Sequence, residues 1–181
     1  MRNFLKLAEG VNTLSLLQQL QTNSYLWDEN TLRTKHPGTA HSQVSDIWLW
    51  FNVVDNKNPL NVINDKDVIP YSGWNLLPAA RPLVFALMNQ VDGVQLGRVI
   101  ISRLPPGKEI EPHVDGGAPA THFQRYQIAL QSLPGCIFEI EDEEVNFLTG
   151  EVWQIDNTKE HSVINNSADD RIVMIVDIRS G

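Results

Sequence analysis

The chain contains a single cysteine, Cys136, among its 181 residues. One thiol cannot form a disulfide within the chain, so nothing in the sequence indicates a disulfide-dependent fold or an oxidising compartment. Cys136 is followed by Ile137 and Phe138, and a cysteine in an apolar run is typical of a small buried residue. We therefore expect Cys136 to be buried.

Positive charge is also scarce. Lysine and arginine together number 14 against 22 acidic residues, which gives a formal net charge of -8. The sequence pI is close to 5.0. Strong electrostatic binding to the phosphate backbone of a nucleic acid needs clustered lysine and arginine side chains. Nucleic acid is therefore not an expected partner.

Long hydrophobic runs are missing as well. No segment approaches the roughly 20 apolar residues of a membrane-spanning helix, and the first residues lack the apolar stretch of a signal peptide. We expect no membrane association and a cytoplasmic location. A length of 181 residues with 42% hydrophobic content suits one domain with one substantial core.

The first half of the chain predicts a few separate elements. Leucines within residues 12–21 fall mainly on one helical face, which predicts a short amphipathic helix capped by Asn12 or Thr13. The aromatic and β-branched run 47–54 predicts a buried strand. Residues 55–74 are rich in Asn, Asp and Pro and predict a long loop, either a lid over a substrate or a plain surface loop. Residues 82–91 resemble a second helix.

From Gly97 onward the sequence consists of short β-rich runs separated by turn residues. Many short strands at this spacing predict an antiparallel sandwich or barrel rather than a βαβ fold. The acidic stretch 141–144 is typical of a solvated hairpin tip. We assign residues 1–95 to helical and strand support with the lid loop, and residues 96–181 to the β core of the same domain. The predicted strands are 99–104, 126–130, 137–140, 152–155 and 172–176.

The pattern with the clearest chemistry joins His113 and Asp115 to His161. Side chains two residues apart project to the same face of an extended segment, so His113 and Asp115 can bind one ion together. His161 follows the strand-like run 152–155 and a turn, and an antiparallel return would lay it across from His113. Two imidazoles and one carboxylate form the facial triad that leaves positions open on non-haem Fe(II). Arg171 would then anchor an anion. We assign no role to the remaining histidines, His36, His41 and His122.

The segments around these residues resemble the aspartyl/asparaginyl β-hydroxylase-like branch of the Fe(II)- and 2-oxoglutarate-dependent oxygenases. The resemblance covers roughly residues 95 to 178 and is not extended to the first half of the chain. It implies a mainly β fold, the double-stranded β-helix or cupin-like jelly roll, here with flanking amino-terminal helices and with iron at one open end. The matching segments are 102–107, 112–115, 125–130, 150–156, 161–166 and Arg171.

The resemblance also implies a set of site residues. His113, Asp115 and His161 bind iron, and Arg171 pairs its guanidinium fork with the distal carboxylate of 2-oxoglutarate. Three further residues are expected at the cosubstrate: Arg125, Ser102 and Gln127, the last standing where many relatives have histidine.

Two tryptophans receive different interpretations. Trp74, at the end of the long loop, is the expected substrate contact, because loop aromatics tend to mark binding surfaces. Trp153 lies in a predicted strand and is expected in the core.

These residues predict a 2-oxoglutarate-dependent dioxygenase that hydroxylates an unactivated C–H bond, with Fe(II), 2-oxoglutarate and O2 as its cofactor and cosubstrates. Relatives that halogenate lack the carboxylate ligand, so Asp115 favours hydroxylation. The expected substrate is an aspartyl or asparaginyl residue in a peptide or protein, or a free amino acid such as proline.

Two alternatives remain open. The first is a non-catalytic jelly-roll binding module that uses His113, Asp115 and His161 for a structural metal or for none. Structural zinc sites normally have four protein ligands, and no fourth partner stands at a regular spacing, which counts against a structural metal. The second is a zinc hydrolase, which lacks support because no HExxH helix is present.

Overall fold

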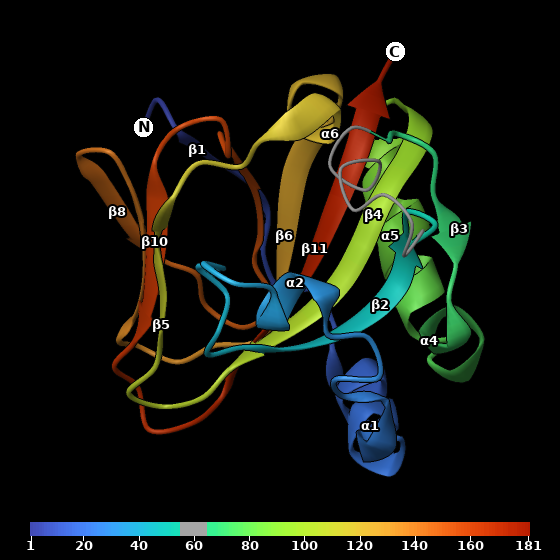
Figure 1. Cartoon of the computed structure of the whole chain (residues 1–181), viewed down its shortest axis with the longest axis horizontal. Helices are drawn as coiled ribbons and strands as arrows, with labels where there is room; N and C mark the ends of the chain where they lie inside the picture. The colour runs from blue at the N-terminus through green and yellow to red at the C-terminus, as the bar shows by residue number, and fades with distance from the viewer. Residues whose placement is uncertain (55–64) are drawn as a thin grey trace.

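The computed structural model describes residues 1–54 and 65–181. Two β-sheets face each other, and helices α1 and α5 cover the outer face of the larger sheet (Figure 1). The larger sheet has the strand order β1-β9-β6-β11-β4-β2-β3, and the smaller has the order β5-β10-β7-β8. The strand pairs in the described ranges are antiparallel. The predicted mainly β, jelly-roll architecture is confirmed.

The larger sheet consists of β1 (Phe4–Ala8), β2 (Ser45–Phe51), β3 (Ile69–Pro70), β4 (Gly93–Leu104), β6 (Gln124–Gln131), β9 (Val152–Ile155) and β11 (Arg171–Ser180). The smaller sheet consists of β5 (Glu109–His113), β7 (Cys136–Ile140), β8 (Glu143–Asn146) and β10 (His161–Asn165). The helices are α1 (Leu14–Thr22), the 3-10 helix η1 (Ser24–Leu26), α2 (Leu32–Lys35), α4 (Ser72–Leu76), α5 (Ala80–Gln90) and α6 (Gly117–His122).

Alternation along the strands divides the larger sheet into two chemically different faces, because successive side chains point to opposite sides. On β11, Met174 and Val176 join the core beneath the helices, whereas Val173 and Ile175 pack with β2 and β4 on the inner face. The same parity places the polar side chains of β4, β6 and β11 on the inner face, toward the smaller sheet. These are Arg98, Ser102, Arg125, Gln127, Arg171 and Asp177.

Helix α1 forms because its leucines make one apolar face, and Leu16 and Leu20 are buried against the larger sheet. Thr13 stands at the N-cap, but its hydroxyl donates to the Leu130 carbonyl at 2.9 Å and so ties the helix to β6. Asn12 accepts a hydrogen bond from the Leu14 N–H at 3.1 Å instead. Of the two predicted caps, Asn12 therefore makes the contact with the helix start.

Aromatic side chains fill the space between the two sheets. Phe147 stacks on Trp153 with ring centroids 5.1 Å apart, and on Phe138 at 5.3 Å. Phe4 meets all three rings edge to face, an arrangement that aromatic pairs favour. Phe138 also stacks beneath the His161 ring at 5.8 Å. The predicted core position of Trp153 is confirmed, and this core supports His161 from below.

Several predicted boundaries change in the structure. Strand β4 begins at Gly93 rather than residue 99, because its first half pairs with the last residues of β11. The predicted lid loop 55–74 contains β3 and the start of α4, and its residues 55–64 lie outside the described residues. The acidic stretch 141–144 is half turn and half strand, since β8 begins at Glu143.

The first half of the chain is part of the same sheet as the second half. Strand β2 pairs with β4, and β1 pairs with β9. Cys136 is buried and free, as expected. None of the helices in the described ranges is long and apolar enough to cross a membrane.

Candidate metal centre

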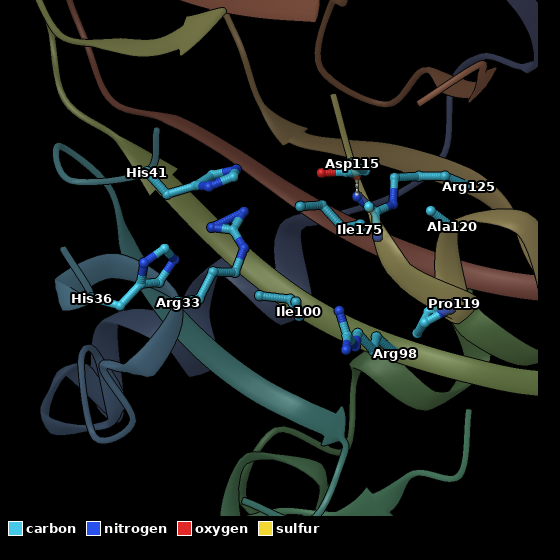
Figure 2. A pocket seen from close by; sticks show the side chains of 11 residues that line it. Arg33, His36, His41, Arg98, Ile100, Asp115, Pro119, Ala120, Arg125 and Ile175 are labelled. Atoms are coloured by element: carbon cyan, nitrogen blue, oxygen red, sulfur yellow. Dashed lines mark hydrogen bonds and ion pairs between the residues drawn. The ribbon is translucent and has the colours of Figure 1, made fainter. Parts of the chain in front are cut away.

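Two adjoining cavities lie on the inner face of the larger sheet. We call the first the inner cavity; residues of both sheets line it, including Ser102, Gln127, His161 and Arg171. We call the second the arginine cavity (Figure 2). Its polar lining consists of Arg33, His36, His41, Arg98, Asp115 and Arg125.

An outer cleft opens beside these cavities, between segment 32–41 and segment 111–116. Arg33 and His41 line the outer cleft, the inner cavity and the arginine cavity alike. The three spaces therefore meet at these two side chains.

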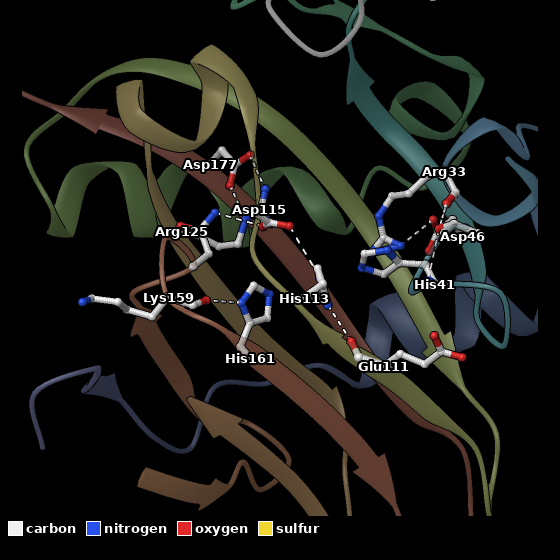
Figure 3. A network of polar contacts seen from close by, with 12 residues as sticks. Arg33, His41, Asp46, Glu111, His113, Asp115, Arg125, Lys159, His161 and Asp177 are labelled. Carbon is white, nitrogen blue, oxygen red and sulfur yellow. Dashed lines mark hydrogen bonds and ion pairs between the residues drawn. The ribbon is translucent and has the colours of Figure 1, made fainter. Parts of the chain in front are cut away.

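The three predicted metal ligands converge where these cavities meet. His113 ends β5 and His161 begins β10, and the strand register pairs the two residues directly. Asp115 follows two residues after His113, and its backbone N–H donates to the Asn157 carbonyl at 3.2 Å. One possible ligand atom from each of the three residues lies within 4.8 Å of the other two. Figure 3 shows the three side chains drawn together.

Both histidines are oriented through Nδ1. Nδ1 of His113 lies 2.7 Å from the Glu111 carbonyl, and Nδ1 of His161 lies 2.8 Å from the Lys159 carbonyl. A carbonyl oxygen only accepts, so Nδ1 carries the proton in each neutral ring and Nε2 keeps a lone pair. Nε2 of His113 is buried and has no hydrogen-bond partner among the described residues. This is the arrangement expected of metal-binding histidines.

Asp115 presents one oxygen to the centre and uses the other for support. Its Oδ2 accepts from Arg125 and from Asn157 Nδ2, the latter at 3.0 Å, while Oδ1 lies 3.6 Å from His113 Nε2. Burial by itself raises the pKa of this carboxyl, but the positive charge of Arg125 and the hydrogen bond from Asn157 help to hold the pKa well below its usual value. The group is therefore an ionised ligand with one oxygen available to a metal.

Arg125 bridges two carboxylates. Its Nε and Nη2 donate to the two oxygens of Asp177 at 2.8 and 2.9 Å, and its Nη1 contacts Asp115. In the structure this guanidinium supports the aspartate ligand. Its predicted contact with a cosubstrate carboxylate stays a prediction.

Arg171 is a buried cation at the inner cavity, with 2% of its surface exposed. Its Nη2 donates to Gln127 Oε1 at 3.0 Å, and its guanidinium lies 5.8 and 5.9 Å from the ring centroids of Phe138 and Phe147. No carboxylate among the described residues pairs with it. Burial lowers the pKa of Arg171 to about 10, so it stays charged at neutral pH.

A buried charge without a counterion is costly, which favours an anionic ligand at Arg171. Ser102 lines the same cavity, and its buried hydroxyl also interacts with Asp46 on the neighbouring strand. Gln127 is placed to orient Arg171. The donor set therefore fits a carboxylate held at a distance from the metal, with Arg171, Ser102 and Gln127 around it.

The structure does not bring Trp74 to these cavities. Trp74 lies on α4 and packs against Trp50 and Phe85, with ring centroids 5.7 and 6.0 Å away, beside the helix-covered core. Its predicted substrate contact stays a prediction without support from this placement.

Four residues at the site were not predicted from the sequence: Arg33, His41, Asn157 and Asp177. The His41 ring meets the His113 ring edge to face with centroids 4.6 Å apart. Asp177 shares the strand parity of Arg171 and interrupts an apolar strand, so strand alternation alone could have indicated it. Arg33 and His41 lie in a segment without periodicity, which gave no signal.

The two sheets of the jelly roll enclose a His, Asp, His cluster and a buried arginine without a carboxylate partner in the described ranges, a donor set that fits an Fe(II)- and 2-oxoglutarate-dependent oxygenase. The family model described as aspartyl/asparaginyl beta-hydroxylase matches residues 17–180. The chain belongs to this family, and the match extends into the first half, beyond the region where the sequence resemblance ended. The protein is thus a 2-oxoglutarate-dependent non-haem iron dioxygenase that uses Fe(II), 2-oxoglutarate and O2.

Solved structures share the fold. A 2OG-Fe(II) oxygenase family oxidoreductase from Burkholderia pseudomallei aligns with a TM-score of 0.66 at 12% identity, covering 98% of this chain and 86% of that one. A Trichoplax adhaerens prolyl hydroxylase was solved with a peptide fragment of the hypoxia inducible factor oxygen degradation domain. It aligns with a TM-score of 0.61 at 12% identity, covering 98% of this chain and 84% of that one. A prolyl-4-hydroxylase from Pseudomonas putida aligns with a TM-score of 0.54 at 13% identity, covering 99% of this chain and 93% of that one. Comparison with curated protein sequences gave no match.

Proposed function

We propose that this enzyme hydroxylates an unactivated C–H bond of an aspartyl or asparaginyl residue in a peptide or protein, or of a free amino acid such as proline. The observation that carries the proposal is the convergence of His113, Asp115 and His161 beside a cavity that ends in Arg171. The family membership supports the aspartyl or asparaginyl alternative.

The three ligands would hold Fe(II) from one side. When bound, iron and 2-oxoglutarate supply the oxidation, in which decarboxylation to succinate and CO2 accompanies transfer of one oxygen atom of O2 to the C–H bond. The protein places the reactants and excludes water. Arg125 and Asn157 occupy Oδ2 of Asp115, so this carboxylate would bind the metal through Oδ1 alone.

Arg171 would hold the distal carboxylate of 2-oxoglutarate. Its guanidinium fork matches a planar carboxylate, and the buried site strengthens the pairing. Gln127 accepts from one Nη2 N–H and so orients the guanidinium, and the Ser102 hydroxyl in the same cavity would supply a further donor. The retained Asp115 favours hydroxylation over halogenation.

The experiment incubates Fe(II)-loaded enzyme with 2-oxoglutarate, O2 and panels of amino acids and of aspartyl and asparaginyl peptides. We expect succinate release matched by a gain of about 16 daltons in one substrate, as oxygen insertion requires. His113→Ala and Asp115→Ala should abolish both signals. His122→Asn is the matched control, because His122 contacts Gln95 outside the three cavities. Unchanged turnover in either triad variant would end the assignment.

A further inference from the structure

We propose that the arginine cavity binds a carboxylate of the substrate, and that Arg33 is the residue that selects it. This inference rests on the proposed function and narrows its substrate class to acids. The carboxylate is either the α-carboxylate of a free amino acid or the side chain of an aspartyl residue. Arg171 holds a different carboxylate, that of the cosubstrate.

Arg33 is carried on a segment that is tied to the metal-binding strand. Thr39 Oγ1 donates to the Arg33 carbonyl at 2.7 Å and accepts from the His41 N–H at 3.1 Å. The Glu111 N–H donates to the Ala40 carbonyl at 3.2 Å, two residues before His113. The segment therefore keeps a fixed position relative to the metal centre, as a substrate-positioning element must.

The Arg33 guanidinium is oriented and has donors to spare. Its Nη1 donates to Asp46 Oδ2 at 3.1 Å; the Asp46 side chain is fully buried and that of Arg33 is 17% exposed. A guanidinium carries more N–H donors than one carboxylate oxygen uses, so the remaining donors can pair with a second carboxylate. Figure 2 shows Arg33 reaching into the cavity beside His41.

The lining of the cavity favours an anion. Arg33, Arg98 and Arg125 line it together, and among the described residues Asp115 is the carboxylate that lines it. The charge of Asp115 is already engaged by Arg125 and faces the metal centre. Burial lowers the pKa of Arg98 to about 10, although the carboxylate of Asp177 acts in the opposite direction.

The remaining walls are apolar. Ile100, Ile175, Pro119 and Ala120 line the same cavity, and a pocket with apolar walls and a few convergent polar groups is typical of a small-ligand site. Such walls fit the aliphatic carbons between a carboxylate and the oxidised C–H bond. An amide side chain would leave the guanidinium donors without an ionic partner, so acids should be preferred over amides.

The test compares acids with their amides. The probes are L-proline against L-prolinamide, and one aspartyl peptide against its asparaginyl counterpart. Binding to the protein loaded with Mn(II) and 2-oxoglutarate is measured by calorimetry, and kcat/KM is measured with Fe(II). The free amino acid and peptide arms identify the source of the carboxylate.

Arg33→Gln alone would leave Asp46 buried without its partner, so the informative variant is Arg33→Gln combined with Asp46→Asn. We expect this double variant to bind the acid probe at least about 30-fold more weakly, the size typical for loss of a buried charged partner. Binding of the amide and of 2-oxoglutarate should stay within about twofold. Lys35→Gln removes the same charge from an exposed position of α2 and should change none of these values.

Two results would overturn the inference. One is an acid-to-amide ratio that is the same in the double variant and in the natural protein. The other is the absence of any binding of acid probes to the natural protein. Failure of the proposed function has a different signature, because no probe would then gain oxygen even where acids bind.

Discussion

Asp177 accepts two hydrogen bonds from Arg125, at 2.8 and 2.9 Å, while the third nitrogen of the same guanidinium contacts Asp115. Asp177 is 3% exposed and Arg125 is 16% exposed, so this chain of charges is largely shielded from water. A carboxylate that is not a metal ligand therefore fixes the orientation of one that is. Residues that orient a metal ligand in this way have a large effect on metal affinity.

Asp177→Asn should weaken metal binding by about 10- to 100-fold, the range typical for loss of a residue that orients a ligand. The amide cannot pair with Arg125 through two oxygens, so Arg125 and Asp115 lose their fixed position. Titration with Mn(II) under anaerobic conditions measures the effect. Asp142→Asn, in an exposed pair with Arg2, is the control. Equal Mn(II) affinity in Asp177→Asn and the natural protein would show that Asp177 does not position the ligand.

Arg171→Met should separate stability from function. The substitution removes a buried cation that has no carboxylate partner in the described ranges, so we expect the free energy of unfolding without ligands to rise by on the order of 1 kcal/mol. The affinity for 2-oxoglutarate should fall at least about 30-fold. Urea unfolding and calorimetry measure the two effects. Arg103→Met removes a guanidinium that stacks on Trp27, away from the cavities, and should leave 2-oxoglutarate binding unchanged. Retained binding in Arg171→Met would contradict its assignment.

Glu151 should contribute a pH-dependent part of the stability. Burial alone raises its pKa, but hydrogen bonds from Lys6, the Leu148 N–H and Trp153 outweigh burial and lower the pKa. A carboxyl with a lowered folded pKa stabilises the protein above its unfolded pKa of 4.5 and loses this contribution as the pH falls through the folded pKa.

Glu151→Gln should therefore lower the free energy of unfolding by about 1 to 3 kcal/mol at pH 7. The difference in this free energy between the variant and the natural protein should shrink below about pH 4. Urea unfolding between pH 7 and pH 3 measures both curves. Glu9→Gln is the control. It removes a carboxylate that contacts the same lysine but is 78% exposed, so the free energy of unfolding should change little. Parallel curves for Glu151→Gln and the natural protein would refute the linkage.

Removal of metal should leave the protein folded. Three clusters of buried hydrophobic side chains pack the core, and burial of this apolar surface stabilises the fold without an ion. Mn(II) at about 100 times its Kd should add roughly 2.7 kcal/mol to the free energy of unfolding, and EDTA should reverse the gain. In His113→Ala, Mn(II) should no longer raise the free energy of unfolding. Unfolding by EDTA alone would show instead that the site is structural.

The sequence determined the faces of the strands. Alternation along residues 171–178 and 124–131 decides which side chains share a side of the sheet, because the period of a strand is two residues. The spacing of His113 and Asp115 placed both on one side of an extended segment in the same way. The triad, the strand series and the family resemblance could therefore be read without coordinates.

Only the tertiary structure decided which faces meet. The pairing of Asp177 with Arg125 depends on the register between β11 and β6, and register follows from the packing of the whole sheet. The His41 ring meets the His113 ring because Thr39 hydrogen bonds hold segment 33–41 together and the Glu111 N–H ties this segment to β5, and the segment itself has no periodicity. Trp74 lies on the outer side for the same reason: the position of α4 against β2 follows from long-range packing, which a local sequence pattern does not encode.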